Sequence, residues 1–256
     1  MIYKRAIAKL RAQDWTAIGI ELAIVVLGVF IGTQVSNWNA GRLERAETNR
    51  MLDQLRPELQ RQIDTYRTAY TYYSTTRRYA DTAFAGWHHD PAVNDTDFVI
   101  AAYQSSQISG IGLNGTTWAS IFGAERLRLI DDPAIRRDLT YLMETDYAPV
   151  SSDAVDTPYR QNVRRIIPIE LQDTIRERCG DVVPPDRPNV IILPPTCQLQ
   201  LDAGKTAATA RDLRSNPELV KDLRFHLSAQ AAFIATAEPI SATANNLLRE
   251  LPGSRH

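Results

Sequence analysis

The side chains best suited to binding a metal are those of His88, His89 and Asp90, which stand next to one another in the chain. Adjacent side chains point in different directions, and no further His or Cys pair at metal-ligand spacing accompanies them. The stretch from Gly86 to Pro91 is typical of a turn that ends a helix. We therefore expect a polar turn here and no metal site.

A second pattern imitates a nucleotide-binding loop. Gly110, Gly112 and Gly115 have the G-x-G-x-x-G spacing of dinucleotide-binding turns, and Asp131 follows at roughly the distance of the acidic residue that binds the ribose. Such turns come directly after a strand, whereas the polar run 104–109 precedes this one, and the chain lacks alternating strands and helices. The sequence predicts a flexible loop without a cofactor.

Other signatures of catalysis are absent from the sequence. It contains no HExxH, GxSxG or P-loop motif, and His226, on an amphipathic stretch, is expected to be structural. With 29 basic and 30 acidic residues, the net charge of −1 gives no electrostatic reason to expect nucleic acid as a partner. We predict a protein that is not an enzyme.

The two cysteines, Cys179 and Cys197, flank a proline-rich loop, 179–197. A pair that closes a loop of this length would form a disulfide worth roughly 3 kcal/mol if the compartment is oxidising. The alternative is two unrelated buried thiols. We favour the disulfide for a domain that lies outside the cytoplasm.

The element that comes before all of these residues is an apolar stretch from Trp15 to Trp38, in which Glu21 is the only charged residue. As a helix it would be roughly 36 Å long, enough to cross a bilayer whose apolar core is about 30 Å thick. Trp15 and Trp38 stand where interfacial anchors of a membrane helix are found. We expect a transmembrane helix, 15–38, in the lipid bilayer, after a basic tail, 1–14.

The basic residues on the two sides of this span predict its orientation. Before it stand Lys4, Arg5, Lys9 and Arg11, and soon after it Arg42, Arg45 and Arg50. This slight bias favours a cytoplasmic N-terminus and a periplasmic bulk in the bacterial inner membrane, in agreement with a disulfide. A cleaved signal peptide is the alternative, but the apolar run is long and no small-residue cleavage site follows it.

One face of the span combines a carboxyl group with small residues. At 100° per residue, Gly28 and Gly32 each lie about 20° from Glu21, and Ala17 lies about 40° from it. Small residues let a second helix approach closely, and a carboxyl in lipid needs a partner or a proton. We expect this face to pack against another transmembrane helix; alternatively, Glu21 reaches the headgroups and the glycines are incidental.

The rest of the chain is expected to be mainly α-helical, with a helical-bundle-like exported domain. A long juxtamembrane helix, 39–87, should carry an apolar stripe for helix packing and a kink or interruption at Pro57. The stripe comprises residues at spacings of three and four: Leu52, Leu55, Leu59, Ile63, Tyr66, Tyr70 and Tyr73.

Further helices are expected within the domain 88–256. The first, capped by Asp95 or Thr96, should run to Gln107. Two more should begin at Asp132-Pro133 and Asn216-Pro217, where a capping residue precedes a proline at the first helical position. The remaining expectations are a helix 159–178 bent at Pro168, a bend near Pro239 in the last helix, 219–251, and one strand, 190–193.

Two stretches resemble a family of bacterial single-span membrane proteins of unknown function. The anchor shares with the family an early glutamate, a central glycine and a Gln before an Asn-Trp-Asn ending: Glu21, Gly28, Gln34 and Asn37-Trp38-Asn39. The second stretch, 117–131, is similar to the family's threonine–aromatic, glycine and Leu-x-Leu-Ile run before a helix. The resemblance implies a membrane-anchored, mostly helical exported protein and brings no activity with it.

These features are consistent with two functions. The first is an interaction or scaffold protein, an accessory subunit that pairs through the span and the long helix with itself or with a larger membrane complex. The alternative is a sensory or ligand-binding ectodomain that acts through a partner.

Overall fold

The computed structural model describes residues 15–110, 112–115, 127–187 and 189–251, with side chains from residue 19 onward. These residues are mainly α-helical and include no β-strand, which confirms the predicted fold class at that level. They belong to two compact units, Met1–Arg50 and Met51–His256. The helix continues beyond Trp38, the predicted end of the span, with exposed side chains from Arg42 to Glu47.

One helix, α2, runs from Trp15 to Trp87, and its 73 residues include both the predicted span and the predicted juxtamembrane helix. Pro57 lies inside α2 and does not interrupt it, so of the two predicted effects, a kink or an interruption, the interruption is wrong. A proline removes one backbone hydrogen bond from a helix, and here the buried stripe on both sides of Pro57 holds the helix together.

The described residues of the second unit form the C-terminal part of α2 and six further α-helices, with two short 3₁₀ turns. Their bounds are α3 Asp95–Gln104, α6 Pro133–Glu144, η1 Ala148–Val150, η2 Ser152–Val155, α7 Pro158–Ile166, α8 Ile169–Cys179, α9 Ala203–Arg214 and α10 Glu218–Glu250.

The caps of these helices differ in part from the predicted ones. Asp132 caps α6 as expected, since its side chain accepts the amide hydrogens of Ala134 and Ile135. The cap of α3 is Asn94, whose side chain accepts from the amide of Asp97, rather than Asp95 or Thr96. α3 also ends at Gln104, before the predicted Gln107. α10 begins at Glu218, with Pro217 itself in the capping position.

The helix expected over 159–178 is in fact two helices, α7 and α8, which separate at Pro168. Ile167 precedes this proline and is extended (ψ 122°), as steric hindrance from a proline ring favours. The amide of Gln172 donates to the carbonyl oxygens of Arg164 (2.7 Å) and Ile167 (2.8 Å). This side chain therefore satisfies two carbonyl oxygens at the C-terminal end of α7, which stabilises the break.

Two further elements differ from the sequence prediction. α9 was not predicted at all, although Asp202 caps it by accepting from the amide of Lys205 at 2.8 Å. The predicted strand 190–193 is absent, and only a single antiparallel bridge joins Ile192 to Val182. The last helix, α10, lies within a residue of its predicted bounds and continues through Pro239, and the bend expected there stays a prediction.

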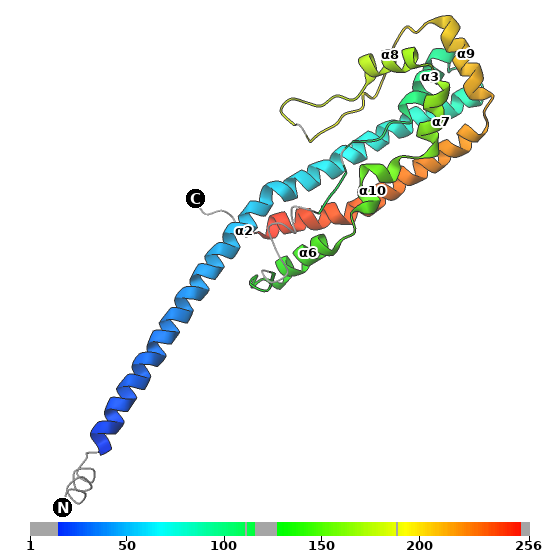
Figure 1. Ribbon diagram of the computed structural model, residues 1–256. Helices are drawn as coiled ribbons and strands as arrows, with labels where there is room; N and C mark the ends of the chain where they lie inside the picture. Colours follow the sequence, from blue (N-terminus) through cyan, green and yellow to red (C-terminus); the bar gives the residue numbers. More distant parts are fainter. Residues whose placement is uncertain (1–14, 111, 116–126, 188, 252–256) are drawn as a thin grey trace, which may run out of the picture. The chain divides into compact units, whose positions relative to one another are not determined.

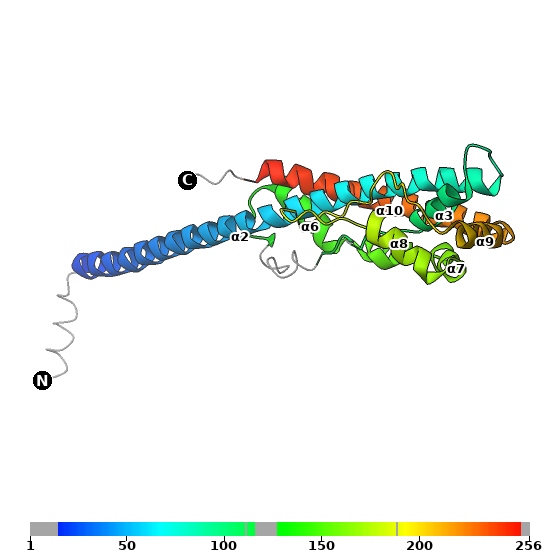
Figure 2. The same cartoon turned by 90° about the horizontal axis from the view of Figure 1, so that it is seen from above.

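The core of the second unit lies between helices that are distant in the sequence. Its part of α2 runs beside α10 in both views (Figure 1, Figure 2). The rings of Tyr73 and Phe233 meet edge to face with their centres 5.5 Å apart. At the far end of α2, the indole of Trp87 packs on Phe98 and donates to the carbonyl oxygen of Leu213 at 3.0 Å. α2 therefore packs against α10, α3 and the end of α9, whereas α6 and α7 pack against α10.

Candidate functional site

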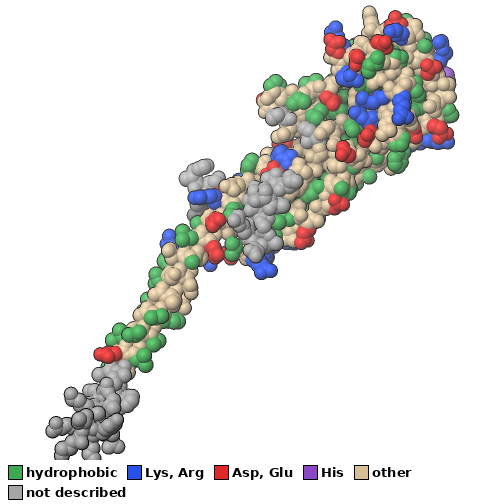
Figure 3. Space-filling view, viewed as in Figure 1, with side chains coloured by type: hydrophobic (Ala, Val, Ile, Leu, Met, Phe, Trp, Pro, Cys, Tyr) green, Lys and Arg blue, Asp and Glu red, His purple; other side chains and the backbone are tan. Residues whose placement is uncertain are grey.

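One helix among the described residues, α2, is long and apolar enough to cross a membrane by length and composition. None of the most apolar 18-residue window in it is buried within the protein. Large side chains such as Leu22, Val29 and Phe30 are more than half exposed. Figure 3 shows apolar side chains along this helix and charged ones over much of the visible face of the second unit. No described residue covers this apolar surface.

The predicted packing face of the span is open. An added Cβ atom at Gly28 or Gly32 would meet nothing within 4 Å, and Glu21 is exposed. The backbone of Ala17 and Trp15 is helical, and their side chains lie outside the described ones. Trp38 is exposed, with the guanidinium of Arg42 centred 5.2 Å from its ring. Among the described side chains of this face, Glu21, Gly28 and Gly32 are therefore uncovered.

Unlike the apolar side chains of the span, most of the leucine–tyrosine stripe is covered by other parts of the second unit. Tyr66 is half-buried and packs against the core cluster of the second unit, whereas Tyr70 is exposed and lies outside this cluster. The buried members are Leu52, Leu55, Leu59, Ile63 and Tyr73. The stripe therefore holds the domain together, and the span is the part of α2 that remains without a neighbour.

The two motifs that imitate chemical sites have structural environments. His88, His89 and Asp90 form an exposed turn after α2, and no group of three or more His, Cys, Asp or Glu among the described residues could hold a metal. Gly112 lies against η1 and η2, where an added Cβ would stand 2.9 Å from the carbonyl oxygen of Val150. A Cβ added at Gly115 would lie 2.5 Å from the ring of Tyr147. These glycines allow close packing of the loop.

Cys179 and Cys197 form a disulfide, which confirms the prediction. The loop that it closes is held against the helices by further contacts. The hydroxyl of Tyr72 donates to Asp181 at 2.8 Å, and that of Tyr79 donates to the carbonyl oxygen of Pro194 at 2.9 Å. The loop is therefore attached to α2 at two places, and the disulfide joins its far end to the end of α8.

A buried polar network lies between α10, α2 and the start of α7. Nδ1 of His226 is 2.7 Å from the hydroxyl of Thr157, and its Nε2 is 2.9 Å from the amide nitrogen of Gln230. Gln230 in turn accepts from Thr76 at 2.9 Å. Since an amide N–H can only donate, Nε2 of His226 is the acceptor and Nδ1 carries the proton toward Thr157.

The environment of His226 keeps its ring neutral. Burial, and next the positive charge of Arg160, lower its pKa from 6.5 to about 4. A hydroxyl beside an imidazole could form a nucleophile–base pair, but Thr157 and His226 are both buried, so a substrate cannot reach them in this conformation. The arrangement therefore satisfies the core rather than presenting a reactive group.

The polar run 104–107, which begins with the last residue of α3, is also buried. Gln104 donates to the carbonyl oxygen of Cys179 at 2.7 Å, and Gln107 accepts from the guanidinium of Arg164 at 2.9 Å. That guanidinium also stacks over the ring of Tyr103, 4.9 Å from its centre. Burial, and next the charge of Arg160, lower the pKa of Arg164. The run thus joins α3 to α7 and to the disulfide.

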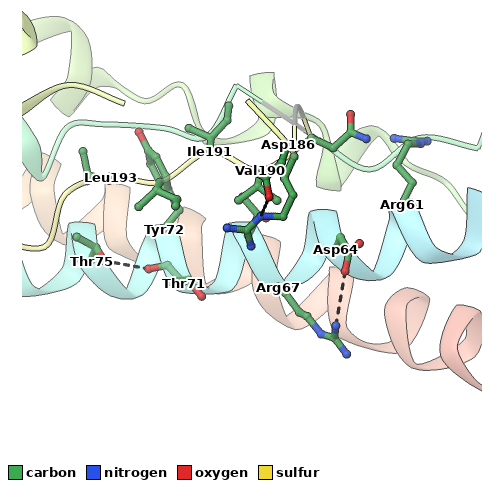
Figure 4. Close-up of a pocket in the computed structure, with 14 residues that line it drawn as sticks. Arg61, Asp64, Arg67, Thr71, Tyr72, Thr75, Asp186, Val190, Ile191 and Leu193 are labelled. Atoms are coloured by element: carbon green, nitrogen blue, oxygen red, sulfur yellow. Dashed lines mark hydrogen bonds and ion pairs between the residues drawn. The ribbon is translucent and has the colours of Figure 1, made fainter. Parts of the chain in front are cut away.

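Sequence reasoning missed a groove of about 510 Å³ on the surface of the second unit, between α2 and the cysteine loop. Figure 4 shows Arg61, Asp64 and Asp186 toward one end and Leu193 toward the other. On the α2 side lie Thr68, Thr71, Tyr72 and Thr75, and on the loop side the aliphatic run 190–193. The run 190–193 was the one sequence signal, since it stands out in a proline-rich loop.

Comparison of the chain with family models, with curated proteins and with solved structures found no match. The resemblance of the span to a single-span family therefore stays a prediction. Its second stretch, 117–131, lies mostly outside the described residues, as does the basic tail 1–14.

Proposed function

We propose that this protein is a membrane-anchored interaction protein that associates through its span with another transmembrane helix. The partner is a second copy of the chain or a subunit of a larger membrane complex. In this proposal the N-terminal tail lies in the cytoplasm and the second unit lies in the periplasm of a bacterium.

The observation that carries the proposal is the uncovered apolar surface of α2. In water, an apolar surface of this extent would be covered by the chain or by a partner, whereas here the chain leaves it bare. A bilayer supplies such a cover, and the length of the helix is sufficient to cross it. The disulfide supports an oxidising compartment for the second unit.

The face of Glu21, Gly28 and Gly32 favours a helix as the partner within the bilayer. Lipid chains cover apolar side chains well, but a carboxyl group in the apolar region is costly without a partner. Glycines four residues apart on one helix face allow two helix backbones to approach closely. Because the stripe on α2 is largely buried in the domain, the association is assigned to the span and not to the long helix.

The proposal is tested by substituting Gly28 with Ile in the full-length protein, alone and together with Glu21→Leu. We expect self-association or partner recovery in mild detergent to weaken at least about tenfold, because the added side chain separates the helices. The measurement is the mass of the purified complex by light scattering, with co-purification of differently tagged copies.

Gly19→Ile is the matched control. Gly19 also lies in the span with open space around it, but at 100° per residue it lies about 160° from Glu21. The control variant should associate like the wild type. Unchanged mass and co-purification in Gly28→Ile and in the double variant would refute the proposal.

A further inference from the structure

The groove between α2 and the cysteine loop has two ends of different chemistry. Toward one end lie Arg61, Asp64 and Asp186, and Leu193 stands toward the other (Figure 4). The volume of about 510 Å³ is within the range of small-molecule sites in proteins. A ligand that matches this groove has a charged head and a short apolar body.

The guanidinium groups indicate the sign of that charge. Arg61 is bound by both carboxylate oxygens of Glu58, and both side chains are largely buried. In contrast, Arg67 and Arg187 lie 3.5 and 3.6 Å from their neighbouring aspartates and donate no hydrogen bond to any described residue. In Figure 4 the side chain of Arg67 extends from α2 away from the cysteine loop, so it must rotate to reach a ligand in the groove. Ion pairs this exposed contribute little free energy and leave both arginines free to make that rotation.

The acidic side chains in the groove do not offset this preference. Asp64 already accepts a hydrogen bond from the amide of Gln60 at 3.0 Å. The carboxylates of Glu58, Asp64 and Asp186 formally balance the charges of the three arginines. The preference for an anionic ligand therefore comes from the N–H donors of Arg67 and Arg187 and not from the net charge of the groove. A planar guanidinium binds a carboxylate through two parallel hydrogen bonds, which favours a carboxylate head.

The aliphatic side of the groove suits the apolar body of the ligand. Ile191 packs against the core, Leu193 is buried, and Ile192 remains partly exposed. Together with the ring of Tyr72 they form an apolar surface next to the hydroxyl groups of Thr71 and Thr75. The disulfide and the hydrogen bonds of Tyr72 and Tyr79 hold the loop that carries this surface against α2.

We propose that this groove binds a small amphiphilic carboxylate, with its carboxylate between Arg67 and Arg187 and its apolar body along residues 190–193. The site is independent of the span and its partner, because every lining residue belongs to the second unit. It gives the exported domain a ligand-binding role in addition to membrane association.

The test uses the full-length oxidised protein in lipid nanodiscs and hexanoate as the probe, with binding measured by isothermal titration and empty nanodiscs subtracted. Hexanol and hexylammonium share the apolar chain but have a neutral and a positive head. We expect saturable binding of hexanoate, and at least tenfold weaker binding of the other two. Inorganic phosphate, which has charge but no apolar body, should also bind at least tenfold more weakly.

Substitutions separate the two halves of the proposed site. Arg67→Gln and Arg187→Gln should each weaken hexanoate binding roughly tenfold, the loss expected for a charge-assisted hydrogen bond. Both side chains are well exposed, so the fold should be retained. Ile192→Ser should weaken binding through the apolar wall. The controls are Arg211→Gln on α9 and Val183→Ser, exposed residues that do not line the groove.

Several results would overturn the proposal. Equal binding of hexanol and hexanoate would indicate simple apolar partition, and equal binding of phosphate would indicate an anion site without an apolar part. Unchanged affinity in both arginine variants would place the ligand elsewhere. Binding of an extended acidic peptide without any binding of hexanoate would assign the groove to a protein partner. None of these results bears on the Gly28→Ile test.

Discussion

At the scale of single residues, the second unit depends on polar side chains that are buried and satisfied. His226, Thr157 and Gln230 form a chain of hydrogen bonds that continues to Thr76 on α2. A buried polar group without a partner is destabilising, so each member of this network fixes the position of the next. The network therefore sets the register between α2 and α10.

His226 should make the stability of the protein depend on pH. Its pKa is lowered to about 4 in the folded protein, so the unfolded chain, with a pKa of 6.5, takes up the proton first. The stabilisation is complete above pH 6.5 and is lost as the pH falls toward about 4, by roughly 3 kcal/mol in total. Unfolding by urea, followed by tryptophan fluorescence between pH 7.5 and 4.5, measures this loss.

Comparison with His226→Gln isolates the contribution of this residue, because Asp181 titrates in the opposite sense. Burial raises the pKa of Asp181, so its protonation favours the folded state at low pH. The variant should lose less stability than the wild type between the two pH values, and His88→Gln, at an exposed position, should behave like the wild type. A wild-type slope in His226→Gln, or an NMR titration of the ring near pH 6.5, would contradict the expectation.

The sequence allowed only part of this residue-scale picture to be predicted. An amphipathic helix indicated a structural His226, since its position falls on the apolar face. The polar run 104–107 gave no sign of burial, because four polar residues in succession are typical of a surface loop. Their partners, such as Arg164 and the carbonyl of Cys179, are more than fifty residues away in the sequence.

At the scale of helices and loops, the prolines show which features local chemistry determines. Pro57 and Pro239 remain within helices, whereas Pro168 separates α7 from α8. At Pro168 the amide of Gln172 satisfies the carbonyl oxygens that the break leaves free. We expected a disruption at each of these three prolines, and the helix is fully broken at one of them, Pro168.

The disulfide is the element-scale feature whose removal should have the largest effect. Replacing both cysteines by serine should lower the free energy of unfolding by about 3 kcal/mol, as for the loss of a loop closure over 18 residues. The measurement is the urea midpoint of unfolding. The reductant dithiothreitol should lower the midpoint of the wild type similarly and leave that of the double variant unchanged. An equal midpoint for the double variant and the oxidised wild type would contradict this.

At the scale of the whole molecule, the disulfide offers a way to test the compartment of the second unit. The chain has two cysteines, both in this disulfide. If the second unit is exported, a membrane-impermeant maleimide should label intact cells only after treatment with a membrane-impermeant reductant. Labelling by a permeant maleimide alone, without reductant, would place the unit in the cytoplasm.

A cysteine in the tail provides the control for this orientation. Ala8→Cys, in a chain whose native cysteines are replaced by serine, should react with the impermeant reagent only after cell lysis. A tail that is labelled in intact cells would reverse the proposed orientation. Mass spectrometry of the purified chain separates an anchor from a signal peptide, because only an anchor retains residues 1–38.

The pairing of α2 with α10 has a consequence for biogenesis. Thr76 and Gln230 are in contact across 154 residues of sequence, and Arg56 donates to the carbonyl oxygen of Leu251 across 195. Contacts this distant form late, since a long loop must close first. During synthesis, the stripe from Leu52 to Tyr73 emerges well before α10 can cover it. Nascent chains thus have a long interval in which holdase chaperones and proteases compete with folding.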